Sequence, residues 1–186
     1  DIFDIDDANM LIVATDRLSA FDVVFDQPIP EKGMVLTSIA NYWFQKTEHI
    51  IQNHLTGISL EEVLLKNEAE MLAGRAVVVK KLRPLAIEAV VRGYLIGSGW
   101  KEYLSSGMVC GIPLPQNIKL AQQLLNPLYT PSSKAGAGEH DTNISFKETE
   151  AIVGSELASQ VKDVSLKIYQ FAAKRALSCG IIIADT

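Results

Sequence analysis

Residues 87–100 have the sequence Ile87-Glu88-Ala89-Val90-Val91-Arg92-Gly93-Tyr94-Leu95-Ile96-Gly97-Ser98-Gly99-Trp100. The apolar run at 89–91 predicts a strand that delivers Arg92, and the glycines after it let the backbone approach a ligand closely. Arg92 offers a planar fork of donors suited to phosphate or carboxylate. The hydroxyl of Ser98 and the amides of Gly97 and Gly99 can complete a cradle around phosphate oxygens. This stretch therefore predicts an anion site at the end of a strand.

A purely structural interpretation of the same stretch stays open. In that interpretation Arg92 forms a salt bridge with Glu88 at the strand end, and the glycines only make a turn. An arginine followed by glycines does not by itself separate the two possibilities.

Residues 129–145 form a second informative stretch, whose Pro, Gly and Ser content indicates a long loop. It concentrates Lys134, Glu139, His140 and Asp141 in eight positions. Loops with groups of both charges are usually just solvated. Together with the Arg92 stretch, however, this loop would suit a phosphorylated substrate with an additional metal or carboxylate.

The bulk composition bounds the class of protein. With 186 residues and 48% hydrophobic content, the chain can bury a substantial core in one domain or two small lobes. The net charge of -5 and the absence of a long Lys/Arg run argue against nucleic-acid binding. No apolar run reaches membrane-spanning length, the amino terminus is acidic, and the two cysteines lie in no metal spacing. We therefore expect a cytoplasmic globular protein without membrane or nucleic-acid partners.

Hydrophobic patterning predicts the elements of the first half of the chain. Residues 2–5 and 10–14 indicate two strands joined by a polar turn. A helix is predicted from about Thr37, with an apolar face facing the core that comprises Ile39, Tyr42, Trp43 and Phe44. Residues 76–79 form a short β-rich run, and the Pro-containing break after it places a lobe boundary near Leu82.

The second half begins irregularly and ends in a long helix. Ser145, with Glu148 three residues later, matches a capping box, and a longer helix is predicted from about Ser155 to Ser178. Residues 181–184 are all apolar, which predicts a buried strand that carries Asp185 to its edge.

Several motifs, taken together and in order, closely resemble the phosphoribosylaminoimidazole-succinocarboxamide synthase (SAICAR synthetase) family. They lie at residues 15–22, 32–33, 79–82, 88–98, 129–134, 138–141 and 181–186. The resemblance runs the whole length of the chain. It implies an α+β, two-lobed fold, with a mainly antiparallel N-terminal sheet lobe at 1–82 that binds nucleotide and a sheet-and-helix lobe at 83–186 that binds substrate. Because family members start earlier and continue further, both chain ends are expected to be truncated.

The resemblance also implies a reaction. The family contains ATP-dependent ligases of purine biosynthesis that join L-aspartate to the carboxylate of 5-amino-1-(5-phosphoribosyl)imidazole-4-carboxylate (CAIR). The expected products are SAICAR, ADP and phosphate, by way of an acyl phosphate. ATP and Mg²⁺ are the expected cofactors, because transfer between anions needs charge neutralisation more than a strong base.

The family resemblance assigns roles in the second lobe residue by residue. It implies that Arg92 and Ser98, with Gly97, hold the ribose 5-phosphate, and that Lys134 and Asp141 orient the base and its reacting carboxylate. Glu88 could reach the nucleotide or a magnesium ion, with the salt bridge to Arg92 as its alternative. A structural hydrogen bond is the expected role of the loop histidine at position 140.

In the nucleotide half, Val79, Lys80, Lys81 and Leu82 match the segment whose backbone receives adenine. Asp185 matches a family acid just before the magnesium-binding stretch, and the next expected acid lies beyond Thr186. Asp16, Arg17 and Ser19 could contact ATP or aspartate. In the structural alternative, Asp16 and Ser19 cap a turn and Arg17 pairs with Asp22.

Two other functions stay open. A small-molecule kinase or other phosphotransferase would use the same kind of nucleotide site, although the sequence has no HRD-like or DFG motif. A non-catalytic nucleotide-binding fragment is the other alternative. The sequence predicts no oligomeric state.

Overall fold

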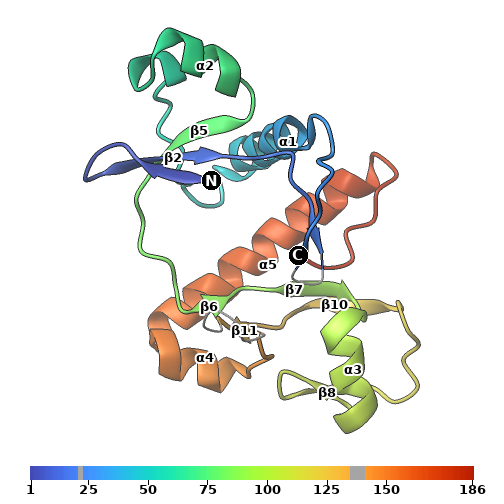
Figure 1. Cartoon of the computed structure of the whole chain (residues 1–186). Helices are drawn as coiled ribbons and strands as arrows, with labels where there is room; N and C mark the ends of the chain where they lie inside the picture. Colours follow the sequence, from blue (N-terminus) through green and yellow to red (C-terminus); the bar gives the residue numbers. More distant parts are fainter. Residues whose placement is uncertain (21–22, 135–140) are drawn as a thin grey trace. The chain divides into compact units, whose positions relative to one another are not determined.

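The hairpin predicted at the start of the chain is confirmed in the computed structural model (Figure 1). Strands β1 (Ile2–Asp4) and β2 (Asn9–Val13) pair antiparallel, and β5 (Ala76–Lys80) pairs with the other edge of β2. The carboxylate of Asp6 accepts hydrogen bonds from the amides of Ala8 and Asn9, both at 2.7 Å, and so closes the turn. The antiparallel N-terminal sheet of the expected α+β fold is therefore present.

The structure describes residues 1–20, 23–134 and 141–186. The chain divides into two compact units, Asp1–Arg83 and Pro84–Thr186. Each unit is considered by itself. In the described part of the chain, no helix combines the length and the apolar composition that crossing a membrane requires.

The core of the first unit lies on one face of its three-stranded sheet. Leu11 and Val13 of β2 and Ala76 and Val78 of β5 are buried there. The remaining elements of the unit are β3 (Ser19–Ala20), β4 (Val23–Val24), the 3-10 helix η1 (Leu60–Glu62), α1 (Lys32–Thr47) and α2 (Lys66–Leu72). Partly buried side chains from and around η1 and α2 pack against the sheet core.

Helix α1 begins five residues earlier than the sequence predicted. The carboxylate of Asp16 accepts hydrogen bonds from the amides of Gly33 at 2.9 Å and Glu31 at 3.2 Å. These are orphan donors at the start of the helix, and the side chain that satisfies them lies 15 and 17 residues earlier in the chain. The predicted apolar face is wrong at Ile39, which is 52% exposed, while the three aromatic residues at 42–44 are half-buried.

We expect the free energy of unfolding to depend on pH through Asp16. Its hydrogen bond from the Gly33 amide, followed by its bond from Arg75, holds the pKa of this carboxyl below its ordinary value of 3.8. A depressed folded-state pKa contributes stability above the unfolded value, and that contribution is lost as pH falls through the folded value. Asp16→Asn should therefore lower the urea midpoint at pH 7 and flatten its decline below pH 3.8.

The matched control is Asp7→Asn, an exposed aspartate in the turn between β1 and β2. It should leave the urea midpoint and its pH dependence close to those of the unmodified protein. Equal effects of the two substitutions would show that Asp16 does not cap α1 in solution.

The second unit is built on short antiparallel strand pairs and a long helix (Figure 1). Its strands are β6 (Ile87–Glu88), β7 (Val91–Tyr94), β8 (Met108–Val109), β9 (Ile112–Pro113), β10 (Gln123–Tyr129) and β11 (Ser132–Ser133). Its helices are α3 (Gly97–Ser106), α4 (Phe146–Val153) and α5 (Ser155–Leu177). The capping box of Ser145 and Glu148 at the start of α4 is confirmed, as is the long helix after it.

Strand β7 and helix α5 meet at a glycine. Val91 of β7, Tyr129 of β10 and Tyr169 of α5 form one buried cluster. A Cβ atom at Gly93 would lie 1.9 Å from the Oη of Tyr169, so only glycine permits this approach. The same Oη donates a hydrogen bond to the carbonyl of Ile183 at 2.7 Å, which ties the end of the chain to α5.

Two sequence predictions about strands in this unit are wrong. Residues 89–90 are not in a strand, and Arg92 lies inside β7 rather than after it. The apolar run after α5 is not a buried strand, because Ile181 and Ile182 are 58% and 61% exposed. Its pairing with β7 is an isolated bridge between Arg92 and Asp185. An apolar run as short as residues 181–184 does not distinguish a buried strand from an irregular segment.

Candidate functional site

Arg92 is the centre of the candidate site. It is only 6% exposed, and its Nη1 donates to Oδ2 of Asp185 at 2.6 Å while its Nη2 donates to Oγ of Ser98 at 2.9 Å. Its ion pair is therefore with Asp185, and the expected alternative with Glu88 is wrong. The Nε atom is buried without a hydrogen-bond partner among the described residues, so the guanidinium retains an unused donor.

The amino terminus of α3 lies directly on this guanidinium. A Cβ atom at Gly99 would lie 3.1 Å from both Cδ and Nε of Arg92, so the helix start can sit this close because position 99 is a glycine. Gly97 begins the helix with φ of 58°, in the left-handed region. Gly97 and Ser98 are exposed, which leaves the first-turn amides and the Ser98 hydroxyl accessible to an anion.

Two residues of the site were missed by the sequence analysis. Nδ2 of Asn143 donates to Oε2 of Glu102 at 2.7 Å, and Oγ of Ser98 lies 3.5 Å from Oδ1 of Asn143. Ser98 and Glu102 stand four residues apart on α3, a spacing that places them on one helix face and that could have indicated the pair. Asn143 carried no such signal, because its neighbours in space come from distant parts of the chain.

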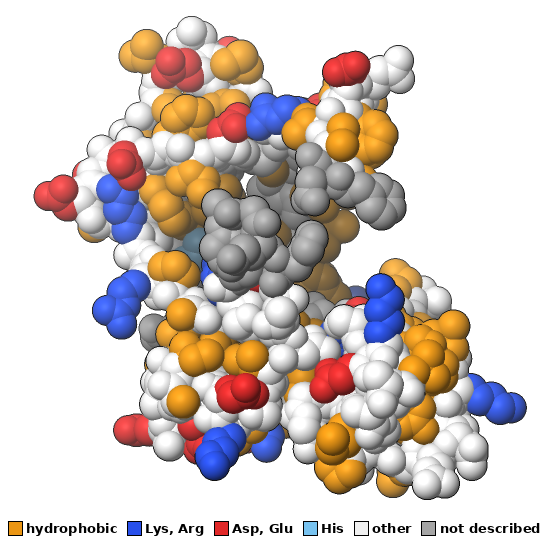
Figure 2. All heavy atoms as spheres, turned by 60° about the horizontal axis from the view of Figure 1, so that its bottom comes forward, with side chains coloured by type: hydrophobic (Ala, Val, Ile, Leu, Met, Phe, Trp, Pro, Cys, Tyr) orange, Lys and Arg blue, Asp and Glu red, His pale blue; other side chains and the backbone are white. Residues whose placement is uncertain are grey.

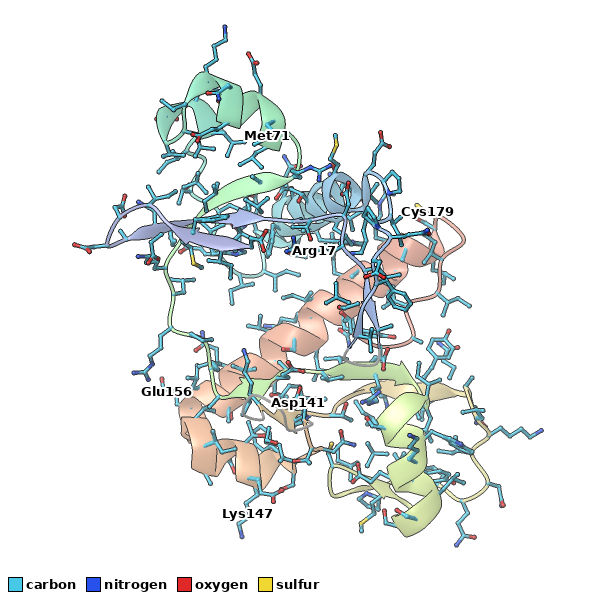
Figure 3. All side chains as sticks on the ribbon, in the orientation of Figure 1. Arg17, Met71, Asp141, Lys147, Glu156 and Cys179 are labelled. Carbon is cyan, nitrogen blue, oxygen red and sulfur yellow. The ribbon has the colours of Figure 1, made fainter. Side chains whose placement is uncertain are left out.

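Lys134 and Asp141 lie at the base of one loop. The amide of Ser133 donates to the carbonyl of Thr142 at 2.9 Å, and their hydroxyl oxygens are also 2.9 Å apart. Lys134 and Asp141 are the residues just beyond this pair, and both are exposed. Figure 3 shows Asp141 beside β6 and β11, whereas Lys147 projects outward from α4. Glu88 of β6 pairs with Ser132 of β11, so its exposed carboxylate belongs to the same region.

The described residues hold no group of three or more His, Cys, Asp or Glu side chains that could bind a metal ion. Asp185 is engaged by Arg92, and its expected role as a magnesium ligand stays a prediction. His140 and Glu139 lie outside the described residues, and so does Asp22. Acidic and basic side chains are interspersed on the face seen in Figure 2.

In the first unit, the structure gives Asp16 and Arg17 structural partners. Besides the α1 amides, Asp16 binds Arg75, with an N···O distance of 3.2 Å. Arg17 pairs with Asp1 at 2.6 Å. Ser19 is exposed in β3. The carboxylate oxygens of Asp16 are thus occupied by a cap and an ion pair, and substrate contact by these three residues stays a prediction.

The segment expected to receive adenine already uses two of its amides. The amide of Lys80 donates to the carbonyl of His54 at 2.9 Å, and that of Lys81 donates to the carbonyl of Ala8 at 2.7 Å. The Lys81 side chain pairs with Asp4 at 2.9 Å. Val79 is fully buried and Leu82 is 63% exposed. Adenine recognition at this segment would therefore have to use other backbone groups than these two amides.

Cys110 lies next to the polar residues of α3, but its thiol has no role in the candidate site. Burial, followed by the nearby Glu102 carboxylate, raises the pKa of its thiol to about 12. Its Sγ lies 3.6 Å from the carbonyl oxygen of Pro131. The thiol stays protonated at neutral pH, so it is not a nucleophile here.

The comparisons with known proteins agree along the whole chain. The SAICAR synthetase family model matches residues 1–186. Two proteins named phosphoribosylaminoimidazole-succinocarboxamide synthase, from Chromobacterium violaceum and Cupriavidus metallidurans, are 56% and 55% identical over 186 residues. Each match covers 100% of this chain, which spans 66% and 62% of the length of these curated relatives.

Solved structures agree as well. A Saccharomyces cerevisiae SAICAR-synthase structure, described as complexed with SAICAR, is 36% identical with a TM-score of 0.89. That match covers 100% of this chain and 63% of the yeast chain. A Pyrococcus horikoshii SAICAR synthetase is 21% identical with a TM-score of 0.76, over 100% of this chain and 71% of that chain, and it supports the fold alone.

Proposed function

The chain belongs to the SAICAR synthetase family, and from this premise we propose that it serves the ATP-dependent joining of L-aspartate to the carboxylate of CAIR. The products are SAICAR, ADP and phosphate. The observation that carries the proposal is the buried Arg92 guanidinium, which binds Ser98 and lies against the start of α3, where Gly97 and Ser98 are exposed. Such an arrangement suits a phosphate monoester.

The reaction proceeds in two displacements. A carboxylate oxygen of CAIR attacks the γ-phosphorus of ATP, the bond from that phosphorus to the β-phosphate oxygen breaks, and ADP leaves. The aspartate amine then attacks the carbonyl carbon of the acyl phosphate. The carbon–oxygen bond to phosphate breaks, phosphate leaves, and the amine loses a proton. Both steps bring anions together, so fixed cations and amide donors lower the barrier.

The residues of the second unit divide these tasks. Arg92, Ser98 and the amide of Gly97 hold the ribose 5-phosphate, because they combine a cation, a hydroxyl and a helix amino terminus. Lys134 and Asp141 orient the imidazole and its carboxylate from the base of their loop. The second unit is thus assigned to substrate binding. The SAICAR in the yeast structure supports this choice of ligand.

The first unit is assigned to ATP, with the segment from Val79 to Leu82 as the adenine side, and to a part of the aspartate site near Asp16. In the second unit, Glu88 and Asp185 are the residues that the family resemblance assigns to the nucleotide. A solved structure of the same fold, 21% identical with a TM-score of 0.75, is a SAICAR synthetase in complex with ADP. Magnesium belongs to the proposed reaction, although the described residues contain no group of three or more His, Cys, Asp or Glu side chains that could hold it. The cytoplasmic location rests on the sequence alone.

A coupled assay of ADP release tests this function. We expect ADP formation by the purified protein to require CAIR and L-aspartate together, because the acyl phosphate is consumed only by the amine. ADP release with an alcohol acceptor and no aspartate would show a kinase instead. ATP binding in calorimetry without ADP release under any condition would show a non-catalytic nucleotide-binding module.

A further inference from the structure

A chain of hydrogen bonds leads from the anion site to the turn between β8 and β9 of the second unit. It runs from Arg92 Nη2 to Ser98 Oγ at 2.9 Å, on to Asn143 Oδ1 at 3.5 Å, and from Asn143 Nδ2 to Glu102 Oε2 at 2.7 Å. The other carboxylate oxygen, Oε1 of Glu102, accepts from the amide of Cys110 at 2.8 Å. Glu102 is therefore held at both oxygens.

The direction of each bond follows from the chemistry of Glu102. An ionised carboxylate only accepts hydrogen bonds, so the atom of Asn143 that faces it must be the amino group. The carbonyl oxygen of Asn143 is then turned toward Ser98. Because Arg92 can only donate, the Ser98 oxygen accepts from Arg92, and its proton points toward Asn143 until a better acceptor arrives.

The backbone fixes the positions of the residues in this chain of hydrogen bonds, which we call the relay. Asn143 forms a bridge with Ser132 of β11, and Glu102 lies on α3 four residues after Ser98. Neither anchor can move without disturbing a paired strand or a helix. The side-chain amide of Asn143 can still turn over, and its hydrogen bond to Glu102 decides which end of the amide faces Ser98.

We propose that Glu102 is a positioning residue that, through the amide of Asn143, orients the Ser98 hydroxyl for binding a phosphate monoester beside Arg92. The identity of the ligand rests on the proposed function, whereas the relay rests on the hydrogen bonds of this unit. Without the Glu102 carboxylate, the Asn143 amide is free to turn its amino group to Ser98. Ser98 then loses the carbonyl acceptor that fixes its side chain, and its hydroxyl is no longer held in one position beside Arg92.

Glu102 has a competing structural role, since it also anchors the Cys110 amide in the turn between β8 and β9. A role limited to that turn would lower stability and affect binding independently of Ser98. A relay would act on binding only while Ser98 is present. A double-mutant cycle between positions 98 and 102 separates the two roles.

The experiment measures the dissociation constant of ribose 5-phosphate by calorimetry for the full chain and its Ser98→Ala, Glu102→Ala and doubly substituted variants. We expect Ser98→Ala to weaken binding about tenfold, because it removes a hydrogen bond to a charged group. Glu102→Ala should weaken it about fivefold, and the double variant should bind no more weakly than Ser98→Ala alone. Asn143→Ala should reproduce the Glu102→Ala effect.

Two matched controls exclude general effects. Glu156→Ala removes an exposed carboxylate from the first turn of α5, and Ser159→Ala removes an exposed hydroxyl from the same helix. Both should leave ribose 5-phosphate binding unchanged. If the effects of the two single substitutions multiply in the double variant, Glu102 does not act through Ser98. That result would overturn the relay without contradicting the anion site. No binding of ribose 5-phosphate to the unmodified protein would overturn both the relay and the proposed substrate site.

Discussion

Replacing Gly93 with alanine should destabilise the protein by about 3 kcal/mol, the upper end of what overpacking a core costs. The new Cβ would lie 1.9 Å from Oη and 2.7 Å from Cζ of Tyr169, whose side chain is almost fully buried. Tyr169 cannot swing away without losing its bond to the Ile183 carbonyl. For a chain of this size the midpoint of thermal unfolding should fall by about 6–12 °C.

Tyr169→Phe tests the cause of this loss. Alone it removes the hydrogen bond to Ile183 and should cost about 1 kcal/mol. Combined with Gly93→Ala it removes the nearest clashing atom, so the double variant should be more stable than the sum of the single losses predicts. Strict additivity of the two losses would place the clash elsewhere.

Arg92→Ala should raise the KM for CAIR roughly 30-fold or more, which corresponds to a loss of about 2 kcal/mol of binding free energy. The KM for ATP should change little. The substitution removes the bidentate cation of the anion site, and no other described cation hydrogen-bonds Ser98. Steady-state kinetics with each substrate varied in turn measure this difference. An unchanged KM for CAIR would remove Arg92 from the phosphate site.

Arg92→Ala also leaves Asp185 without its partner, so a matched variant must separate binding from stability. Asp185→Asn breaks the ion pair and keeps the Arg92 guanidinium. It should lower the midpoint of thermal unfolding, yet ribose 5-phosphate should bind as well as before or more tightly, because a negative charge near the anion is gone. Weaker binding on loss of Asp185 would mean that the ion pair itself forms the site.

The elements that the sequence predicted well are those defined by near neighbours in the chain. The β1–β2 hairpin follows from strand patterning and a polar turn, and the start of α4 follows from a capping box that spans three residues. The candidate anion site was proposed from the sequence for the same reason. Arg92, Gly97 and Ser98 lie within seven positions, so one short stretch carried the cation, the turn and the hydroxyl.

What the sequence could not show depends on partners far away in the chain. Helix α1 starts early because Asp16, from another segment, caps it. Asn143 joins the site across 45 positions from Ser98. Propensity and periodicity describe only local preferences, and tertiary contacts of this kind override them.

The Arg92–Asp185 pair has a consequence for the order of events during synthesis. The two residues are 93 positions apart, so the ribosome finishes β7 long before the carboxylate emerges. Until then the guanidinium is a cation without its counter-charge, and burying it under α3 is costly. Contacts of such sequence separation form slowly, because loop-closure entropy must be overcome first. The anion site is therefore completed only after residue 185 has been synthesised, and a nascent chain interrupted before that point exposes an Arg92 guanidinium that lacks its Asp185 partner.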